Sequence, residues 1–215
     1  MTFRSRLADF YNSEWCDLRT IRGMKNCVAR VVRFVIRLSL VSCSMLLLDA
    51  EEPTPDTKDP WKTLAVLIGQ WEGEVSGQPG NGKAQREYKF ILNKHFIHIT
   101  NQSTYPPQQK NPKGETHEDI GFFSYDKLAK KLMLRQFHIE GFVNQFALQS
   151  IAEDGRTLVF ESTAIENIAP GWRARETYRV LSDHEFVETF ALAEPNSDFA
   201  TYSETHFHRK AKLRR

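Results

Sequence analysis

From residue 68 to the end of the chain, short strand-like runs alternate with turn-forming residues, and this alternation constrains the fold most. Within each run, apolar or aromatic side chains tend to recur at every second position, the period of a strand with one buried face. Gly, Pro, Asn, Asp and Ser cluster between the runs, as they do in tight turns. The predicted strands cover residues 68–77, 83–93, 95–105, 115–125, 130–140, 142–152, 156–164, 172–182, 184–193 and 199–211.

The connections between these runs favour a closed barrel. Nearly all of them are of hairpin length, which places consecutive strands side by side in antiparallel order. Closure removes the two exposed edges that an open sheet of this size would leave. We therefore predict an all-β fold, a roughly ten-stranded antiparallel up-and-down barrel over residues 60–215. A barrel of this size encloses its own side chains or one small ligand.

One short helix is expected before the first strand. Asp59 followed by Pro60 is a helix-start signal, a capping residue and then proline at the first helical position. Trp61, Leu64 and Leu67 follow at helical spacing. We expect the helix to end near Gly69, where the period changes to two.

The first 50 residues resemble a leader. Met24 opens a basic stretch, and residues 38–48 form a short apolar core that ends at small Ala50, the order of a secretory signal. This predicts export to the periplasm or the extracellular space, with residues 51–59 as a linker. The alternatives are a lipid anchor at Cys43, a retained segment that would be the chain's only link to a membrane, and a cytoplasmic protein. The true start is either Met1 or Met24.

Charge and cysteine are unevenly divided along the chain. The chain has 29 basic and 27 acidic residues, and residues 1–50 hold eight of the basic and four of the acidic ones. Residues 51–215 therefore carry 21 basic and 23 acidic residues, a net charge of −2. A mildly acidic barrel lacks the basic footprint of a nucleic-acid binder, and no nucleic-acid partner is expected. Cys16, Cys27 and Cys43 are the only cysteines, which excludes a disulfide framework or a Cys-based zinc site in the barrel.

The start of the first strand carries a family resemblance. Gly69-Gln70-Trp71, directly after the expected short helix, resembles the Gly-x-Trp signature of the calycins, which include the lipocalins and fatty-acid-binding proteins. With ten strands and a chain end that contains His208 before Ala211-Lys212-Leu213-Arg214, the chain is most similar to the nitrobindin family. Those are haem-binding barrels that resemble the C-terminal domain of a THAP protein.

The nitrobindin resemblance implies a cofactor and a site. Haem b would be held with His208 as the iron ligand, and His206 and Trp71 are further cofactor-binding candidates. The chemistry would then be nitric oxide binding and isomerisation of peroxynitrite to nitrate. From the residues alone two orientations of the last strand remain open. Either His206 and His208 face inward, or Thr205 and Phe207 do, because residues two apart share a face.

Two His–carboxylate pairs are candidates for a different chemistry. His117 shares a strand face with Asp119, and His138 shares one with Glu140. An imidazole beside a carboxylate can act as a general base with its orienting partner. The alternative is a set of hydrogen-bonded polar groups at the barrel rim. The enzyme hypothesis requires that the pairs converge inside one cavity.

Arginines give the remaining candidates. Arg175 lies with Arg173 and Arg179 on one strand face, and Tyr178 lies on the other. A buried arginine can clamp a carboxylate ligand, whereas an outer face would hold cross-strand ion pairs. Arg135, among apolar neighbours, is the second candidate for the interior. We therefore expect a small-molecule-binding barrel, with haem or a fatty-acid-like apolar ligand; the alternative is a small enzyme. The ligand-lining candidates are Arg135, His138, His117, Arg175 and Tyr178.

Overall fold

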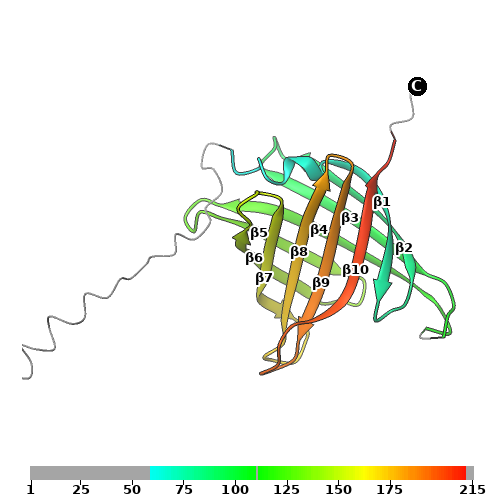
Figure 1. Ribbon diagram of the computed structural model, residues 1–215. Helices are drawn as coiled ribbons and strands as arrows, with labels where there is room; N and C mark the ends of the chain where they lie inside the picture. The colour runs from blue at the N-terminus through cyan, green and yellow to red at the C-terminus, as the bar shows by residue number, and fades with distance from the viewer. Residues whose placement is uncertain (1–58, 110, 212–215) are drawn as a thin grey trace, which may run out of the picture. The chain divides into compact units, whose positions relative to one another are not determined.

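The computed structural model describes residues 59–109 and 111–211, which form a closed barrel of ten antiparallel strands (Figure 1). Each strand pairs with its neighbours in the chain, and β1 pairs with β10 to close the sheet. The all-β prediction is confirmed. The elements are η1 (Ala65–Leu67), β1 (Gly69–Gly77), β2 (Gly82–Ile91), β3 (Phe96–Tyr105), β4 (Glu115–Asp126), β5 (Lys131–His138), β6 (Val143–Ile151), β7 (Thr157–Glu166), β8 (Arg173–Ser182), β9 (Glu185–Ala193) and β10 (Ala200–Arg209).

The segment before β1 is shorter than the expected helix. Asp59 Oδ1 accepts a hydrogen bond from the Trp61 backbone N–H at 3.0 Å, so the predicted cap forms. Only one turn and the 3₁₀ segment η1 follow, because the chain reverses into β1 at Gly69, whose φ of +130° favours glycine. A helix needs more residues than this to be stable.

Apolar side chains fill the part of the barrel next to η1. Leu64 and Leu67 cap this core, and Trp71 lies beneath them with 1% of its surface exposed. The Trp71 ring packs edge-on against Phe186 at 4.7 Å, and its Nε1 donates to the Leu67 carbonyl at 2.7 Å. The η1 end is therefore packed solid, which leaves the other end of the barrel for a ligand.

Arg209 fastens β10 to the same end. Its guanidinium lies 4.2 Å from the centre of the Trp71 ring and donates to the carbonyls of Ile68, at 2.7 Å, and of Val66. A side chain at Gly69 would meet this guanidinium at 2.7 Å, which is a second reason for glycine there. The residues of the calycin-like signature thus serve packing at the η1 end.

Several predictions concern residues outside the described ranges. They include the leader 1–50, the start at Met24, the anchor at Cys43 and most of the linker 51–59, together with the end of the Ala211-Lys212-Leu213-Arg214 sequence. Within the described residues, no helix is long and apolar enough to cross a membrane.

Candidate functional site

A cavity of about 350 Å³ lies inside the barrel, lined by the strand ends that point away from η1. This volume is at the low end of the range for sites that bind small organic molecules. Its rim is mainly apolar and aromatic, and its floor is polar. The rim side chains are Phe142, Ile165, Ile168, Trp172, Phe190, Leu192 and Tyr202, and the floor side chains include Arg86, Asn101, Asp119, Gln136, Asn144, Glu176 and Glu188.

The floor is held together by an ion pair that crosses the barrel lumen. Arg86 on β2 pairs with Glu188 on β9, and each side chain is only 7% exposed. Arg86 also donates to Asn101 Oδ1 at 3.0 Å and to the Tyr88 hydroxyl at 3.2 Å. A buried guanidinium with these three partners is already engaged, so it is not a free clamp for a ligand carboxylate.

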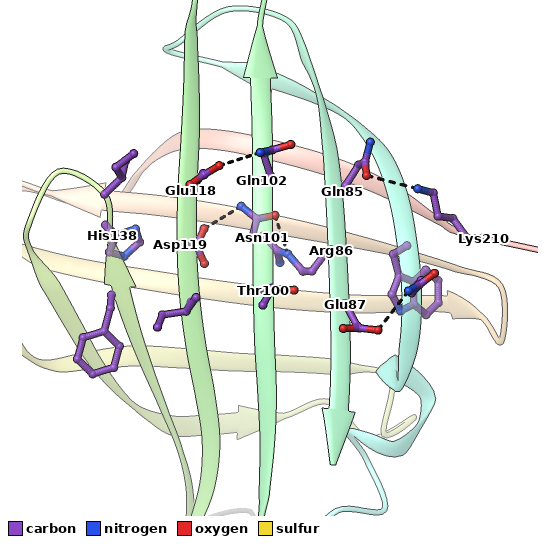
Figure 2. A pocket seen from close by; sticks show the side chains of 15 residues that line it. Gln85, Arg86, Glu87, Thr100, Asn101, Gln102, Glu118, Asp119, His138 and Lys210 are labelled. Atoms are coloured by element: carbon purple, nitrogen blue, oxygen red, sulfur yellow. Dashed lines mark hydrogen bonds between the residues drawn. The ribbon is translucent and has the colours of Figure 1, made fainter. Parts of the chain in front are cut away.

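Four floor residues form a row across neighbouring strands. Arg86, Asn101, Asp119 and His138 are successive cross-strand partners on β2, β3, β4 and β5. Figure 2 shows Asn101 between Arg86 and Asp119, with His138 beside Asp119. Asn101 donates to Asp119 Oδ2 at 2.7 Å. The register of three hairpins therefore places Asp119 between an amide and an imidazole.

The two predicted His–carboxylate pairs meet at the edge of this row. His117 Nε2 lies 3.4 Å from Asp119 Oδ2 and 3.5 Å from His138 Nδ1, while His117 Nδ1 lies 2.8 Å from Glu140 Oε1. His138 Nε2 contacts the Asn144 amide at 3.1 Å. The four side chains therefore line one cavity, but Glu140 lies in the turn after β5 and pairs with His117 rather than with His138 as predicted.

The pKa values of the two imidazoles, His117 and His138, are shifted in opposite directions. Burial opposes the charged form of His117, but hydrogen bonds to Asp119 and Glu140 outweigh it and raise its pKa to about 9. Burial lowers the pKa of His138. Burial alone would raise the pKa of Asp119, yet the His117 hydrogen bond and the Arg86 charge hold it below its ordinary value. At neutral pH the cluster therefore holds an imidazolium, a carboxylate and a neutral imidazole.

Glu176 faces the floor from β8 with its carboxyl group buried. Burial raises its pKa well above the ordinary value of 4.5, and the nearby Glu188 raises it further against the opposing charge of Arg86. Glu176 Oε1 accepts a bond of 3.4 Å from the Gln136 amide. Among the described residues, Glu176 Oε2 and Gln136 Oε1 have no hydrogen-bond partner.

We expect Glu176→Gln to stabilise the barrel in a pH-dependent way. Because the folded-state pKa is raised, the unfolded chain loses the proton first, and wild-type stability falls as the pH rises above about 4.5. The free energy of unfolding of Glu176→Gln should exceed that of wild type by up to about 1.4 kcal/mol per pH unit above this point. Urea unfolding from pH 4 to 8 measures the difference. A difference that does not change with pH would contradict the buried, protonated carboxyl group.

The last strand turns its histidines outward. Thr205 and Phe207 are buried, whereas His206 and His208 are exposed, and His206 lies 3.1 Å from Glu204. This is the second of the two orientations considered from the sequence, and it follows from the greater burial energy of Phe207. His208 therefore does not reach the interior, and the orientation needed for the predicted haem ligand is corrected.

The predicted arginines also lie on the outer face. Arg175 forms an ion pair with Glu161 at 2.6 Å, and Arg135 donates to the Ser124 hydroxyl at 3.1 Å on the outside. Neither lines the cavity, so their interior placement is corrected. Tyr178 points inward but packs in the core below the floor. Trp71 packs beside η1 and does not line the cavity either.

The sequence prediction missed the charged floor. Arg86, Glu176 and Glu188 were not among the candidates, although each shares strand parity with buried neighbours such as Ala84 and Tyr178. This parity was the available signal. Parity alone does not identify these residues, because charged side chains almost always lie on the outer face.

A wider, open depression of about 750 Å³ involves the same wall. Figure 2 shows its exposed polar side chains hydrogen-bonded in pairs, Glu118 with Gln102 and Gln85 with Lys210. Because these groups already have partners at the surface, the internal cavity is the stronger candidate site.

The comparisons with known proteins support the fold. No family model matches the chain, and no curated protein matches it. The solved structure of Rv2717c from M. tuberculosis is similar, with a TM-score of 0.52 and 16% identity over 70% of this chain and 97% of that chain. The S-type phycobiliprotein lyase CPES from Guillardia theta has a TM-score of 0.45 and 10% identity over 71% of this chain and 93% of that chain. A redesigned beta barrel has a TM-score of 0.38 and 8% identity over 69% of this chain and 96% of that chain.

Of these, the similarity to Rv2717c bears on the architecture of the chain. The likeness to Rv2717c supports the same kind of barrel and, at this identity, nothing finer. A closed ten-stranded barrel with an internal cavity has the form of a small-molecule-binding barrel, which agrees with the calycin-like part of the resemblance. Membership of the nitrobindin family stays a prediction.

Proposed function

We propose that the protein binds a small organic molecule with an apolar body and a hydrogen-bond-donating group, such as a hydroxyl or an amine. The single observation that carries this is a buried acceptor on the floor, the amide oxygen Gln136 Oε1, which has no partner among the described residues. A buried polar atom left unsatisfied costs about 1–3 kcal/mol. A donor group on the ligand would recover this energy, while the apolar rim would cover the rest of the molecule.

The charges around the cavity select against an anionic group. Apart from the buried, protonated Glu176, the carboxyl groups of Glu115, Asp119, Glu140 and Glu188 line it, against one arginine and two histidines. Arg86 is neutralised by Glu188. A fatty acid would bring its carboxylate to this acidic floor, and the arginines once predicted to receive it, Arg135 and Arg175, lie outside. The fatty-acid hypothesis is therefore disfavoured.

Haem is a poor match for the residues of this site. The predicted iron ligand, His208, is exposed on the outer face. The two imidazoles inside, His117 and His138, are held by Asp119, Glu140 and Asn144. We derive no chemistry through haem, and nitric oxide or peroxynitrite chemistry stays a prediction of the family resemblance.

Three octyl compounds test the proposal. Titration of octanol, octylamine and octanoate at pH 7, followed by calorimetry and by the fluorescence of Trp172 at the rim, should show binding of the first two. We expect the repulsion between its carboxylate and the acidic groups of the cavity to weaken octanoate binding at least about tenfold, which corresponds to about 1.4 kcal/mol. Gln136→Met should weaken octanol binding by removing an acceptor.

The controls are the outer-face variants Arg135→Met and Arg175→Met, which should leave binding unchanged. Preferential octanoate binding that is lost in either variant would establish the fatty-acid carrier instead. A hemin titration completes the comparison: a shifted Soret band that disappears in His208→Ala would establish the haem protein. Either of these results would reject the proposal.

A further inference from the structure

The side chains of His117, Asp119 and His138 form a cluster of potential metal ligands beside the cavity. Asp119 is two residues from His117 on the same face of β4, and His138 is its cross-strand partner on β5. The potential ligand atoms of the three side chains lie within 4.8 Å of one another. Two neighbouring strands thus direct two imidazoles and one carboxylate toward one point.

We propose that His117, Asp119 and His138 bind a divalent first-row transition-metal ion, with at least one coordination position open to the cavity. Two imidazoles and a carboxylate suit zinc or iron(II), whereas calcium and magnesium prefer oxygen ligands alone. All three side chains line the cavity, so a position not taken by protein faces it. The inference uses only these side chains and does not depend on the organic ligand.

The distances between ligand atoms fit such an ion. With metal–ligand bonds of about 2.0–2.1 Å and tetrahedral angles, two ligand atoms lie roughly 3.3 Å apart. His117 Nε2 lies 3.4 Å from Asp119 Oδ2 and 3.5 Å from His138 Nδ1. Two of the three separations therefore already match a tetrahedral ion, and the third is at most 4.8 Å.

Each proposed ligand also has a second residue that orients it. Glu140 Oε1 is 2.8 Å from His117 Nδ1, which leaves Nε2 for the metal, and the Asn144 amide is 3.1 Å from His138 Nε2, which leaves Nδ1. In the structure the Asn144 Nδ2 faces His138 Nε2; when Nδ1 binds the metal, Nε2 carries the proton and the amide must turn to present its oxygen. Metal-binding histidines almost always donate their other N–H to such a partner.

An independent observation comes from the carboxylate itself. The Asp119 side chain is 5% exposed, and its Oδ1 has no hydrogen-bond partner among the described residues. Asn101 donates to the other oxygen, Oδ2, at 2.7 Å. A buried carboxylate oxygen without a partner is what a bound cation would satisfy.

Zinc titration of the full-length chain tests the inference. Cys16, Cys27 and Cys43 are replaced by serine and any affinity tag is removed, so that no thiol or tag binds the ion. Calorimetry should show one Zn²⁺ per chain, and Co²⁺ should give visible absorption bands without a thiolate charge-transfer band. His138→Ala and Asp119→Asn should lose this binding, while the outer-face double variant His206→Ala, His208→Ala should keep it.

A second variant guards against misfolding. Glu140 is half-exposed, so Glu140→Gln should preserve the urea unfolding transition yet weaken zinc binding by about 10–100-fold, the usual effect of removing an orienting partner. Binding that is equal in wild type and His138→Ala, or that is lost in the outer-face double variant, would overturn the inference. An absence of zinc binding in the wild-type protein would also overturn the inference. The protonated imidazole of His117 would then take the place of a metal ion beside Asp119. No octyl compound is present, so failure here does not bear on the organic ligand.

Discussion

Replacing Arg86 by methionine is expected to lower the free energy of unfolding by about 3–5 kcal/mol. The guanidinium is the main positive charge beside Glu188 on the cavity floor, and both side chains are 7% exposed. Methionine matches much of the length of the side chain but leaves the Glu188 carboxylate buried without its partner. It also removes donors to Asn101 and Tyr88. Urea unfolding at pH 7 measures the loss.

Two further variants identify the cause of this loss. Arg86→Met combined with Glu188→Met should recover part of the stability, because no buried charge is then left alone. Arg175→Met, which breaks the partly exposed pair with Glu161, should cost no more than about 1 kcal/mol. A cost for Arg86→Met as small as that for Arg175→Met would show that solvent reaches the floor.

The strands were predictable because their signals are local. Alternation within each run and Gly, Pro, Asn or Asp between runs locate all ten strands to within two residues of the observed bounds. Only the helix before β1 was overestimated, since spacing alone does not reveal that the chain turns at Gly69. Closure followed from the short connections, which leave consecutive strands no other neighbours.

The contents of the barrel were harder to predict because they depend on pairing across the lumen. Nothing near Arg86 in sequence indicates Glu188, which approaches it from β9. Burial of the pair is favourable only when both are present, so neither residue alone identifies an inward charge. The outward turn of His208 was decidable in principle, because Phe207 is the better core residue at the adjacent position.

The candidate site was half predicted. His117 with Asp119, and His138 with Glu140, follow from strand parity within one strand and its turn. That the two pairs meet requires the register of the β4–β5 hairpin, which places Asp119 opposite His138. A shift of one residue would turn one pair to the outer face. Register is set by the turn and by the core contacts of both strands together.

Trp71→Ala is expected to lower the free energy of unfolding by about 3–5 kcal/mol, as for other large buried aromatic side chains. The ring is 1% exposed, packs on Phe186, and bridges η1 to the barrel through the Leu67 carbonyl. Its loss leaves a cavity between Leu67 and the stacked Arg209 guanidinium. Trp71→Phe should cost less, because the aromatic contact is kept and only the hydrogen bond and part of the volume are lost.

Trp61→Ala is the matched control, because Trp61 belongs to the same end but is only partly buried against Phe90. Its effect on unfolding should be clearly smaller. Because Trp71 does not line the cavity, folded Trp71→Phe should bind octanol and zinc as the wild type does. A Trp71→Phe variant of near-normal stability that fails to bind either would instead place this tryptophan in the site, as the family resemblance implied. Equal unfolding losses for Trp61→Ala and Trp71→Ala would show that η1 packing, rather than the Trp71 ring itself, holds this end closed.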